Sequence, residues 1–162
     1  MRIAAGLIIM VLCSAWGFRS SIMLKRRCAL IRELRLMVER YSIEIACTAP
    51  TLDELAGCGG GEFGSILQKN AAQCGDIRSA WRTSVGELSA QPHCGKEEAA
   101  VLSEMGQALG TCPADSQQSL LKLYSARLDR LLEQAEAAAE QKGRLYRSGG
   151  VLAGMGVAVL LL

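Results

Sequence analysis

Two uncharged apolar runs, one at each end of the sequence, constrain this chain more than any other feature. Residues 3–18 contain no charged side chain, and neither do residues 148–162, where the sequence stops on three leucines. At about 1.5 Å per helical residue these runs span roughly 22–24 Å, which is short for a hydrocarbon core of about 30 Å unless flanking side chains snorkel or the bilayer thins. We therefore predict an N-terminal membrane segment over residues 1–18 and a C-terminal membrane anchor over residues 148–162.

Basic residues lie on the inner side of both runs, and positive charge is retained on the cytoplasmic side of a membrane. The two flanks independently predict a cytoplasmic location for residues 19–147. We therefore expect a cell-membrane protein whose central helical domain, residues 19–147, faces the cytoplasm and whose ends contact membrane lipid. The basic flanks are Arg19, Lys25, Arg26 and Arg27 after the first run, and Lys142, Arg144 and Arg147 before the last.

A cleavable signal peptide is the alternative interpretation of the first run. Its length fits the apolar part of a signal peptide, and Cys13, Ser14 and Ala15 supply small residues for a cleavage site. A signal peptide, however, carries its positive charge before the apolar run, whereas most of the charge here follows it. The charge distribution favours a retained segment, and cleavage stays open as the alternative.

The seven cysteines are those of a protein in a reducing compartment. Their number is odd, their spacings are wide, and no C-x-x-C occurs. We therefore expect unlinked thiols, no zinc site and no bound cofactor. His93 next to Cys94 is the one pair that suggests thiol chemistry, but neighbours along a chain rarely point at each other, and a nucleophilic pair also needs an orienting group. We interpret this pair as part of a loop.

Composition predicts an all-α chain of one domain. The 162 residues include three prolines and 4% aromatic residues, with long stretches rich in Ala, Leu, Glu and Arg, which favour helix. A net charge of +2 without a concentrated basic face excludes a nucleic-acid partner. The glycines of residues 57–64 lack both the preceding strand and the Lys-Ser/Thr pair of a phosphate-binding loop, so we expect them to join two helices.

Apolar residues at helical spacing predict a bundle of about six helices between the short flanking membrane helices. The first runs from Leu24 to Cys47, nearly continuous with the membrane run, and Pro50 ends it. We expect Leu102 and Leu128 to face inward. Further helices are expected after the Thr51–Glu54 capping box, from Phe63 to a break at Gly75-Asp76, around Trp81, from Glu97 to Leu109, and from a cap at Asp115 or Ser116 into the terminal anchor.

Five segments together resemble the stage III sporulation protein AB family of endospore-forming bacteria, over essentially the whole chain. The order and spacing of the segments carry the resemblance, because none of them is a catalytic signature. The segments are the first run ending in "WGF", "IRELRLMVERYSIEI" followed by "TAPTL" (Ile31–Leu52), "AWRTSV" around Trp81, "MGQALGTCPADSQQ" (Met105–Gln118) and the closing "GGVLAGMGVAVLLL".

The resemblance implies a non-enzymatic, platform-like component of the complex built between mother cell and forespore, similar to platform proteins of type II secretion and type IV pilus machines. The implied partners are a cytoplasmic ATPase, stage III sporulation protein AA, and other channel subunits, with a homo-oligomer left open. No catalytic residue comes with the family, and Leu109, Gly110 and Asp115 match positions that we interpret as structural. The alternatives are a generic membrane-anchored scaffold outside sporulation and an enzyme using thiol chemistry.

Overall fold

The computed structural model is built from helices alone in the residues it describes, which confirms the all-α prediction for that part of the chain. The backbone is described for residues 2–48, 52–109 and 114–161, and side chains for residues 19, 21–47, 54–109 and 116–142. Six helices follow one another in these ranges: α1 (Arg2–Thr48), α2 (Leu52–Cys58), α3 (Gly61–Gln73), α4 (Ile77–Ser89), α5 (Lys96–Ala108) and α6 (Ala114–Leu161).

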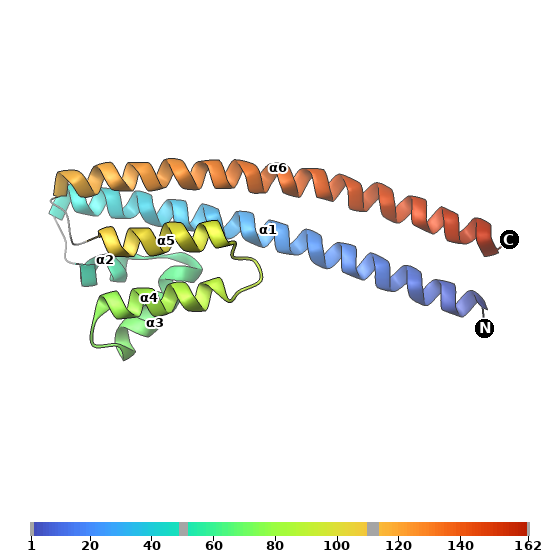
Figure 1. The fold of residues 1–162 in the computed structure, drawn as a ribbon, viewed down its shortest axis with the longest axis horizontal. Helices are drawn as coiled ribbons and strands as arrows, with labels where there is room; N and C mark the ends of the chain where they lie inside the picture. The colour runs from blue at the N-terminus through green and yellow to red at the C-terminus, as the bar shows by residue number, and fades with distance from the viewer. Residues whose placement is uncertain (1, 49–51, 110–113, 162) are drawn as a thin grey trace.

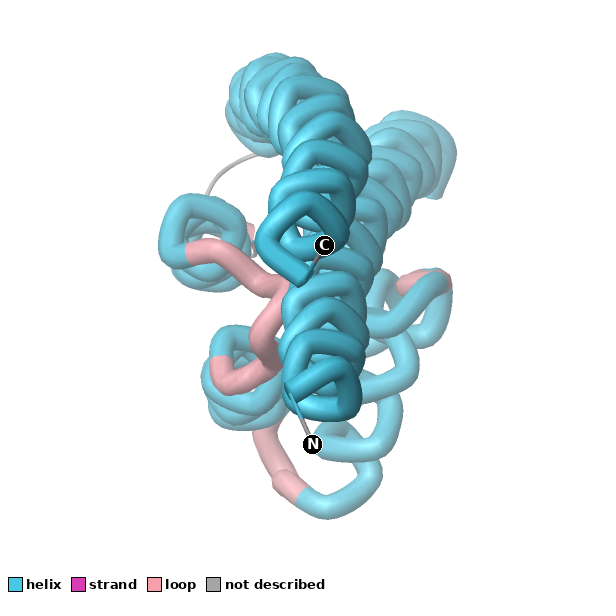
Figure 2. The backbone as a smooth tube through the Cα atoms, turned by 90° about the vertical axis from the view of Figure 1, so that its right-hand side faces the viewer, coloured by secondary structure: helices cyan, strands magenta, loops and turns pink. Residues whose placement is uncertain are grey.

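The first and last helices form one long pair. They lie side by side along the molecule, and the N- and C-terminal ends lie together, away from α2–α5 (Figure 1). Seen along its length, the molecule stacks α6 on α1 and carries the shorter helices beside them (Figure 2). No proline interrupts residues 2–48, so α1 runs unbroken through the boundary between the first apolar run and the central domain, as predicted. α6 likewise continues to Leu161.

The core lies between α1 and α6 and between this pair and α3–α5. The apolar residues of α1 that lie three and four apart share one face of the helix, and this row is entirely buried. Leu102 and Leu128 are each 1% exposed, which confirms that both face inward. The buried row of α1 is Leu30, Ile31, Leu34, Met37, Val38, Tyr41 and Ile45, and the opposing row of α6 is Leu121, Tyr124, Leu128, Leu131 and Ala135.

Trp81 holds α3, α4 and α5 together. Its ring meets Phe63 of α3 edge-on, with centroids 5.1 Å apart. Its indole N–H donates to the carbonyl of Leu102 in α5 at 2.8 Å. Gly106 lies directly against the indole, where a Cβ atom would come within 2.2 Å of the ring. A buried tryptophan needs a partner for its N–H, and α5 supplies it together with a flat surface.

The break predicted at Gly75-Asp76 is present, because α3 ends at Gln73 and α4 begins at Ile77. The Asp76 carboxylate accepts hydrogen bonds from the backbone N–H groups of Arg78 and Ser79, at 3.3 and 3.1 Å. A hydrogen bond from the Ser79 hydroxyl, and then these two backbone bonds, lower the pKa of Asp76, because they stabilise its charged form. Asp76 is therefore the N-cap of α4.

Two predicted boundaries were wrong. Between Gly57 and Gly64 only Gly59 and Gly60 lie outside a helix, so the glycine loop is much shorter than expected. The backbones of Gly59 and Gly64 pack so closely that a Cβ on Gly64 would come within 2.3 Å of the Gly59 carbonyl oxygen, so this short connection needs a glycine at position 64. α6 already begins at Ala114, so Asp115 and Ser116 lie in its first turn rather than before it.

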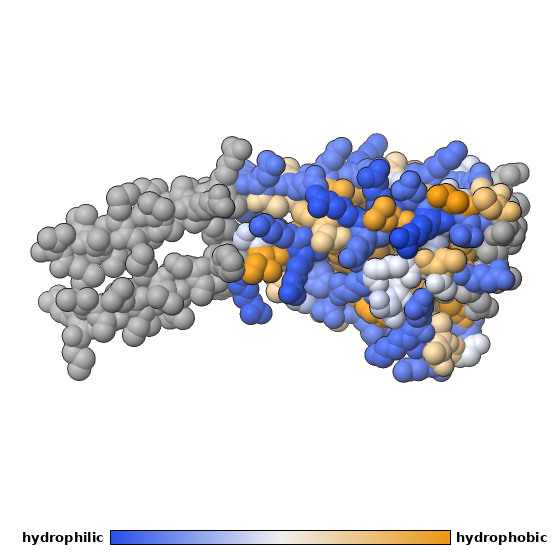
Figure 3. All heavy atoms as spheres, turned by 180° about the vertical axis from the view of Figure 1, so that it is seen from behind, coloured by the Kyte–Doolittle hydropathy of each residue, from blue (hydrophilic) through white to orange (hydrophobic). Residues whose placement is uncertain are grey.

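The segments predicted to enter the membrane, residues 1–18 and 148–162, lie outside the residues whose side chains are described. Within the described residues, no helix is both long and apolar enough to cross a membrane. The capping residue Thr51 and Gly110, predicted to end α5, also lie outside the described residues. On the face drawn in Figure 3, hydrophilic side chains dominate the described surface and apolar ones are scattered between them.

Candidate interaction surface

Two ion pairs show the register of α1 against α6. Arg32 lies 2.5 Å from Glu136, and Arg35 lies 2.8 Å from Asp129. All four side chains are about half exposed, so the pairs contribute little to stability, about 0–1 kcal/mol each, and the buried apolar rows of the two antiparallel helices do most to hold the alignment. Because the helices are antiparallel, each step toward the N-terminus of α1 matches a step toward the C-terminus of α6. Extended in this way, the register places position 18 beside about position 148. The inner borders of the two apolar runs are therefore level.

In the α4–α5 loop, His93 and Cys94 do not form the pair that thiol chemistry would need. The His93 ring pairs with Glu62, with Nε2 and Oε2 2.9 Å apart, rather than with Cys94. Burial, and then the nearby Glu98 carboxylate, raise the pKa of the Cys94 thiol to about 11. A thiol with that pKa stays protonated at neutral pH, and only the thiolate is a good nucleophile. The loop interpretation of the pair fits this geometry.

Glu98, an acid that the sequence analysis overlooked, is completely buried at the start of α5. Its Oε1 accepts from Arg27 of α1, with Nε and Nη2 each 2.7 Å away. Its Oε2 has no hydrogen-bond partner in the described part of the chain and lies against Gly95, where a Cβ atom would clash with it. The pair ties the α4–α5 loop to α1, and Gly95 leaves the room that the carboxylate needs.

A signal for Glu98 was present in the sequence. Glu98 lies three, four and seven residues before Val101, Leu102 and Met105, which puts a carboxylate on the apolar face of α5. Acidic residues are almost never fully buried without a partner. A charge in an apolar row therefore indicates a buried ion pair, although periodicity alone does not identify Arg27 as the other member.

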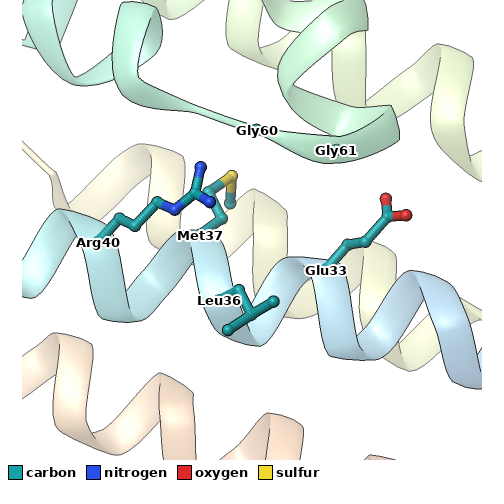
Figure 4. A pocket seen from close by; sticks show the side chains of 6 residues that line it. All are labelled: Glu33, Leu36, Met37, Arg40, Gly60 and Gly61. Carbon is teal, nitrogen blue, oxygen red and sulfur yellow. The ribbon is translucent and has the colours of Figure 1, made fainter.

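A pocket of about 250 Å³ opens between α1 and the α2–α3 connection (Figure 4). Glu33 points across it, and its Oε2 accepts the backbone N–H of Glu62 at 2.8 Å. Gly61, at φ 81°, takes a left-handed conformation beside this carboxylate. The Glu33 carboxylate thus occupies the N-terminus of α3, the place where a phosphate would otherwise bind. The pocket is lined by Glu33, Leu36, Met37, Arg40, Gly60 and Gly61.

The five described cysteines carry free thiols, two of which, Cys47 and Cys58, are exposed. Within the described residues, no three His, Cys, Asp or Glu side chains come together as a metal site would require. Leu109 is 3% exposed and ends α5 by donating its N–H to the Met105 carbonyl at 2.9 Å, consistent with a structural position. The side chain of Asp115 lies outside the described residues.

Comparison with protein families matches residues 2–162 to stage III sporulation protein AB. The chain belongs to this family. Neither the curated proteins nor the solved structures contain a match to it. The match extends through both apolar runs and the whole helical domain, and it identifies the chain as a protein of the third stage of sporulation. The family resemblance carried by the five sequence segments is thereby confirmed.

Proposed function

We propose that the protein is a membrane-anchored, non-enzymatic, platform-like component of the complex between mother cell and forespore, with residues 19–147 in the mother-cell cytoplasm. Membership of the stage III sporulation protein AB family supports the setting. It also removes the basis for a generic scaffold outside sporulation. In this proposal both apolar runs enter the same membrane, and the long α1–α6 pair holds the domain below it.

The register of α1 against α6 is the observation that carries the proposal. Two apolar runs far apart in sequence begin at the same level of one antiparallel helix pair, which suits insertion into one membrane from one side. Arg19, Lys25 and Arg26 are exposed just inside the first run, and Lys142 is exposed just inside the second. Such basic side chains favour the cytoplasmic side and interact with anionic headgroups.

The cytoplasmic ATPase, stage III sporulation protein AA, is the partner that we propose for the helical domain, together with other channel subunits. Family membership supports this setting, and the protonated Cys94 offers no nucleophile for the alternative enzyme. Tagged protein extracted from sporulating cells in mild detergent should therefore co-purify with the ATPase. Recovery of the intact complex without the ATPase would contradict this partner.

The exposed thiols of Cys47 and Cys58 provide a direct test of topology. In protoplasts, a membrane-impermeant maleimide should leave both cysteines unlabelled until the membrane is permeabilised. The protein should also stay in the membrane fraction after an alkaline carbonate wash. Labelling of Cys47 in sealed protoplasts, with an internal cytoplasmic marker still protected, would overturn the proposed orientation.

The enzyme alternative is tested by removing the candidate nucleophile. We expect Cys94→Ser to form spores at the parental level, because a scaffold does not need the thiol. Cys28→Ser is the matched control, since Cys28 is a buried cysteine away from the loop. Loss of sporulation in Cys94→Ser alone, with normal protein level and membrane location, would favour thiol chemistry.

A further inference from the structure

The acidic and basic residues of this chain are separated along its length. All 16 aspartates and glutamates lie between Glu33 and Glu140. Between these acids and the inner borders of the two apolar runs lie bases alone. We refer to six of them as the basic collar: Arg19, Lys25 and Arg26 on α1, and Lys142, Arg144 and Arg147 on α6. Arg27, the next base on α1, is held by Glu98 and is not included.

The register of the long helix pair brings the two halves of the collar to one level. The ion pairs of Arg32 and Arg35 with α6 place position 19 beside about position 147, and position 25 beside about position 141. At 1.5 Å per residue, the collar spans a band of about 11 Å directly inside the apolar runs. Figure 1 shows this end of the helix pair away from α2–α5.

The structure describes the side chains of four collar residues, and all four are exposed and form no ion pair within the described part of the chain. These four are Arg19, Lys25, Arg26 and Lys142. Deeper in the domain, by contrast, Arg32 and Arg35 of α1 are paired with acids of α6. The collar charges are therefore available to a partner from outside the chain.

Side-chain direction brings the α1 part of the collar closer to the apolar run. The Cα–Cβ bonds of an α-helix tilt toward its N-terminus, and the N-terminal end of α1 carries the first apolar run. Lys25 and Arg26 therefore lean toward that run. Glu140, the last acid of the chain, is level with about position 26. It lies on the antiparallel α6, so the same tilt directs it away from the border.

The orientation of the chain in a membrane does not by itself require this separation of charge. The rule that keeps positive charge on the cytoplasmic side counts Lys and Arg, and Asp and Glu contribute little to it. Acids would therefore be tolerated within residues 19–32 and 141–147, yet none occurs there. A negatively charged surface, in contrast, repels acids as strongly as it attracts bases. An acid-free collar is what contact with such a surface favours.

We propose that the basic collar binds anionic phospholipid headgroups and selects them over zwitterionic ones. The inference rests on the proposed function, because the apolar runs must bring the collar to a membrane. Each half of the collar follows directly on an apolar run, which favours a membrane over a nucleic acid as the surface that it meets. Each Lys or Arg near an anionic surface strengthens binding about fivefold, and this effect extends over roughly one Debye length of 8–10 Å.

Spin-labelled lipids measure this selectivity in full-length protein reconstituted into phosphatidylcholine vesicles. Trace spin-labelled phosphatidylglycerol should be immobilised at the protein about fivefold in preference to trace spin-labelled phosphatidylcholine, as electron spin resonance reports. Sodium chloride at about 0.5 M should remove most of this preference, because it screens the headgroup charge. Equal immobilisation of the two lipids at low salt would overturn the proposal.

Two collar residues can be neutralised without touching the core. Lys25→Gln combined with Arg26→Gln should lower the lipid preference by at least about half, while the remaining basic flank still orients the chain. Lys69→Gln combined with Arg82→Gln is the matched control, because it makes the same change in charge at two exposed residues of α3 and α4. The control should keep the parental preference. A loss no greater in the collar variant than in the control would overturn the collar as the binding surface.

Free phosphate is the other source of the same chemistry. Sodium phosphate should lower the preference no more than sodium chloride of equal ionic strength, because the collar is placed to meet a surface. A larger effect of phosphate would mean that the collar binds the free anion, and would overturn headgroups as its ligand.

Flotation of the same samples after an alkaline wash separates this proposal from the membrane anchorage. Anchored protein without a lipid preference refutes the collar alone. Protein that does not stay with the vesicles refutes the anchorage, and flotation at neutral pH then decides about the collar. In that case the protein should float with phosphatidylglycerol vesicles and not with phosphatidylcholine vesicles, and flotation with neither would overturn both proposals.

Discussion

Replacing Gly106 with alanine should destabilise the protein even though alanine is the better helix former. The added Cβ would lie 2.2 Å from both Cδ1 and Nε1 of Trp81, far inside van der Waals contact. Trp81 is 3% exposed and is held by Phe63 and by its bond to the Leu102 carbonyl, so it has little freedom to withdraw. Overpacking of this kind costs about 1–3 kcal/mol.

The net effect follows from two further contributions. If the indole swings aside, the buried hydrogen bond to Leu102 is lost, at a cost of about 1–3 kcal/mol. Alanine returns up to about 1 kcal/mol through helix propensity, less near the end of α5 where Gly106 lies. We therefore expect the free energy of unfolding to fall by about 2–3 kcal/mol.

Gly86→Ala is the matched control. Gly86 lies inside α4, and no atom comes within 4 Å of the position its Cβ would take. The same chemical change should there raise the free energy of unfolding by about 0.5–1 kcal/mol. Urea unfolding of the full chain in mild detergent, followed by Trp81 fluorescence in a Trp16→Phe background, measures both. A Gly106→Ala protein as stable as the parent would refute the tight packing against Trp81.

Three further results are expected. Leu128→Asp should cost several kcal/mol of a total of about 5–15 kcal/mol and abolish cooperative unfolding, as circular dichroism would report; an unchanged melt would mean that Leu128 faces solvent. Glu98→Gln should cost about 1–3 kcal/mol in urea unfolding, less than for a fully buried pair, because Arg27 is 34% exposed and can be solvated. Cys94 should react with iodoacetamide far more slowly than the exposed Cys47 at pH 7.5, and equal alkylation rates would contradict the raised pKa of Cys94. The free energy of unfolding should fall as the pH rises from about 9 toward 11, because the Cys94 thiol loses its proton at lower pH in the unfolded chain than in the folded one.

Helical periodicity predicted the parts of this fold that depend on neighbours along the chain. The buried row of α1, from Leu30 to Ile45, and that of α6 follow the three- and four-residue spacing of apolar side chains. The break at Asp76 follows from a residue that caps the next helix with its own side chain. These features need no knowledge of what a segment packs against.

Contacts between distant segments could not be predicted in the same way. Glu33 caps the start of α3 from another helix, so nothing near Gly61 in the sequence announces that the helix begins there. The ion pairs of Arg32 and Arg35 depend on which carboxylates of α6 lie opposite them, and several acids were available. The pairing of Glu98 with Arg27 likewise depends on how distant segments pack.

The close association of the first and last helices sets an order for synthesis and folding. The apolar face of α1 between Leu30 and Ile45 lacks most of its cover until the ribosome has made Leu121 to Ala135. The α3–α4 and α4–α5 contacts join neighbours in sequence and close short loops, which form faster than distant ones. The helices α3, α4 and α5 can therefore pack together before α6 has been synthesised. During that interval the nascent chain exposes a long apolar surface, and a truncation anywhere before residue 121 would make that exposure permanent and favour aggregation.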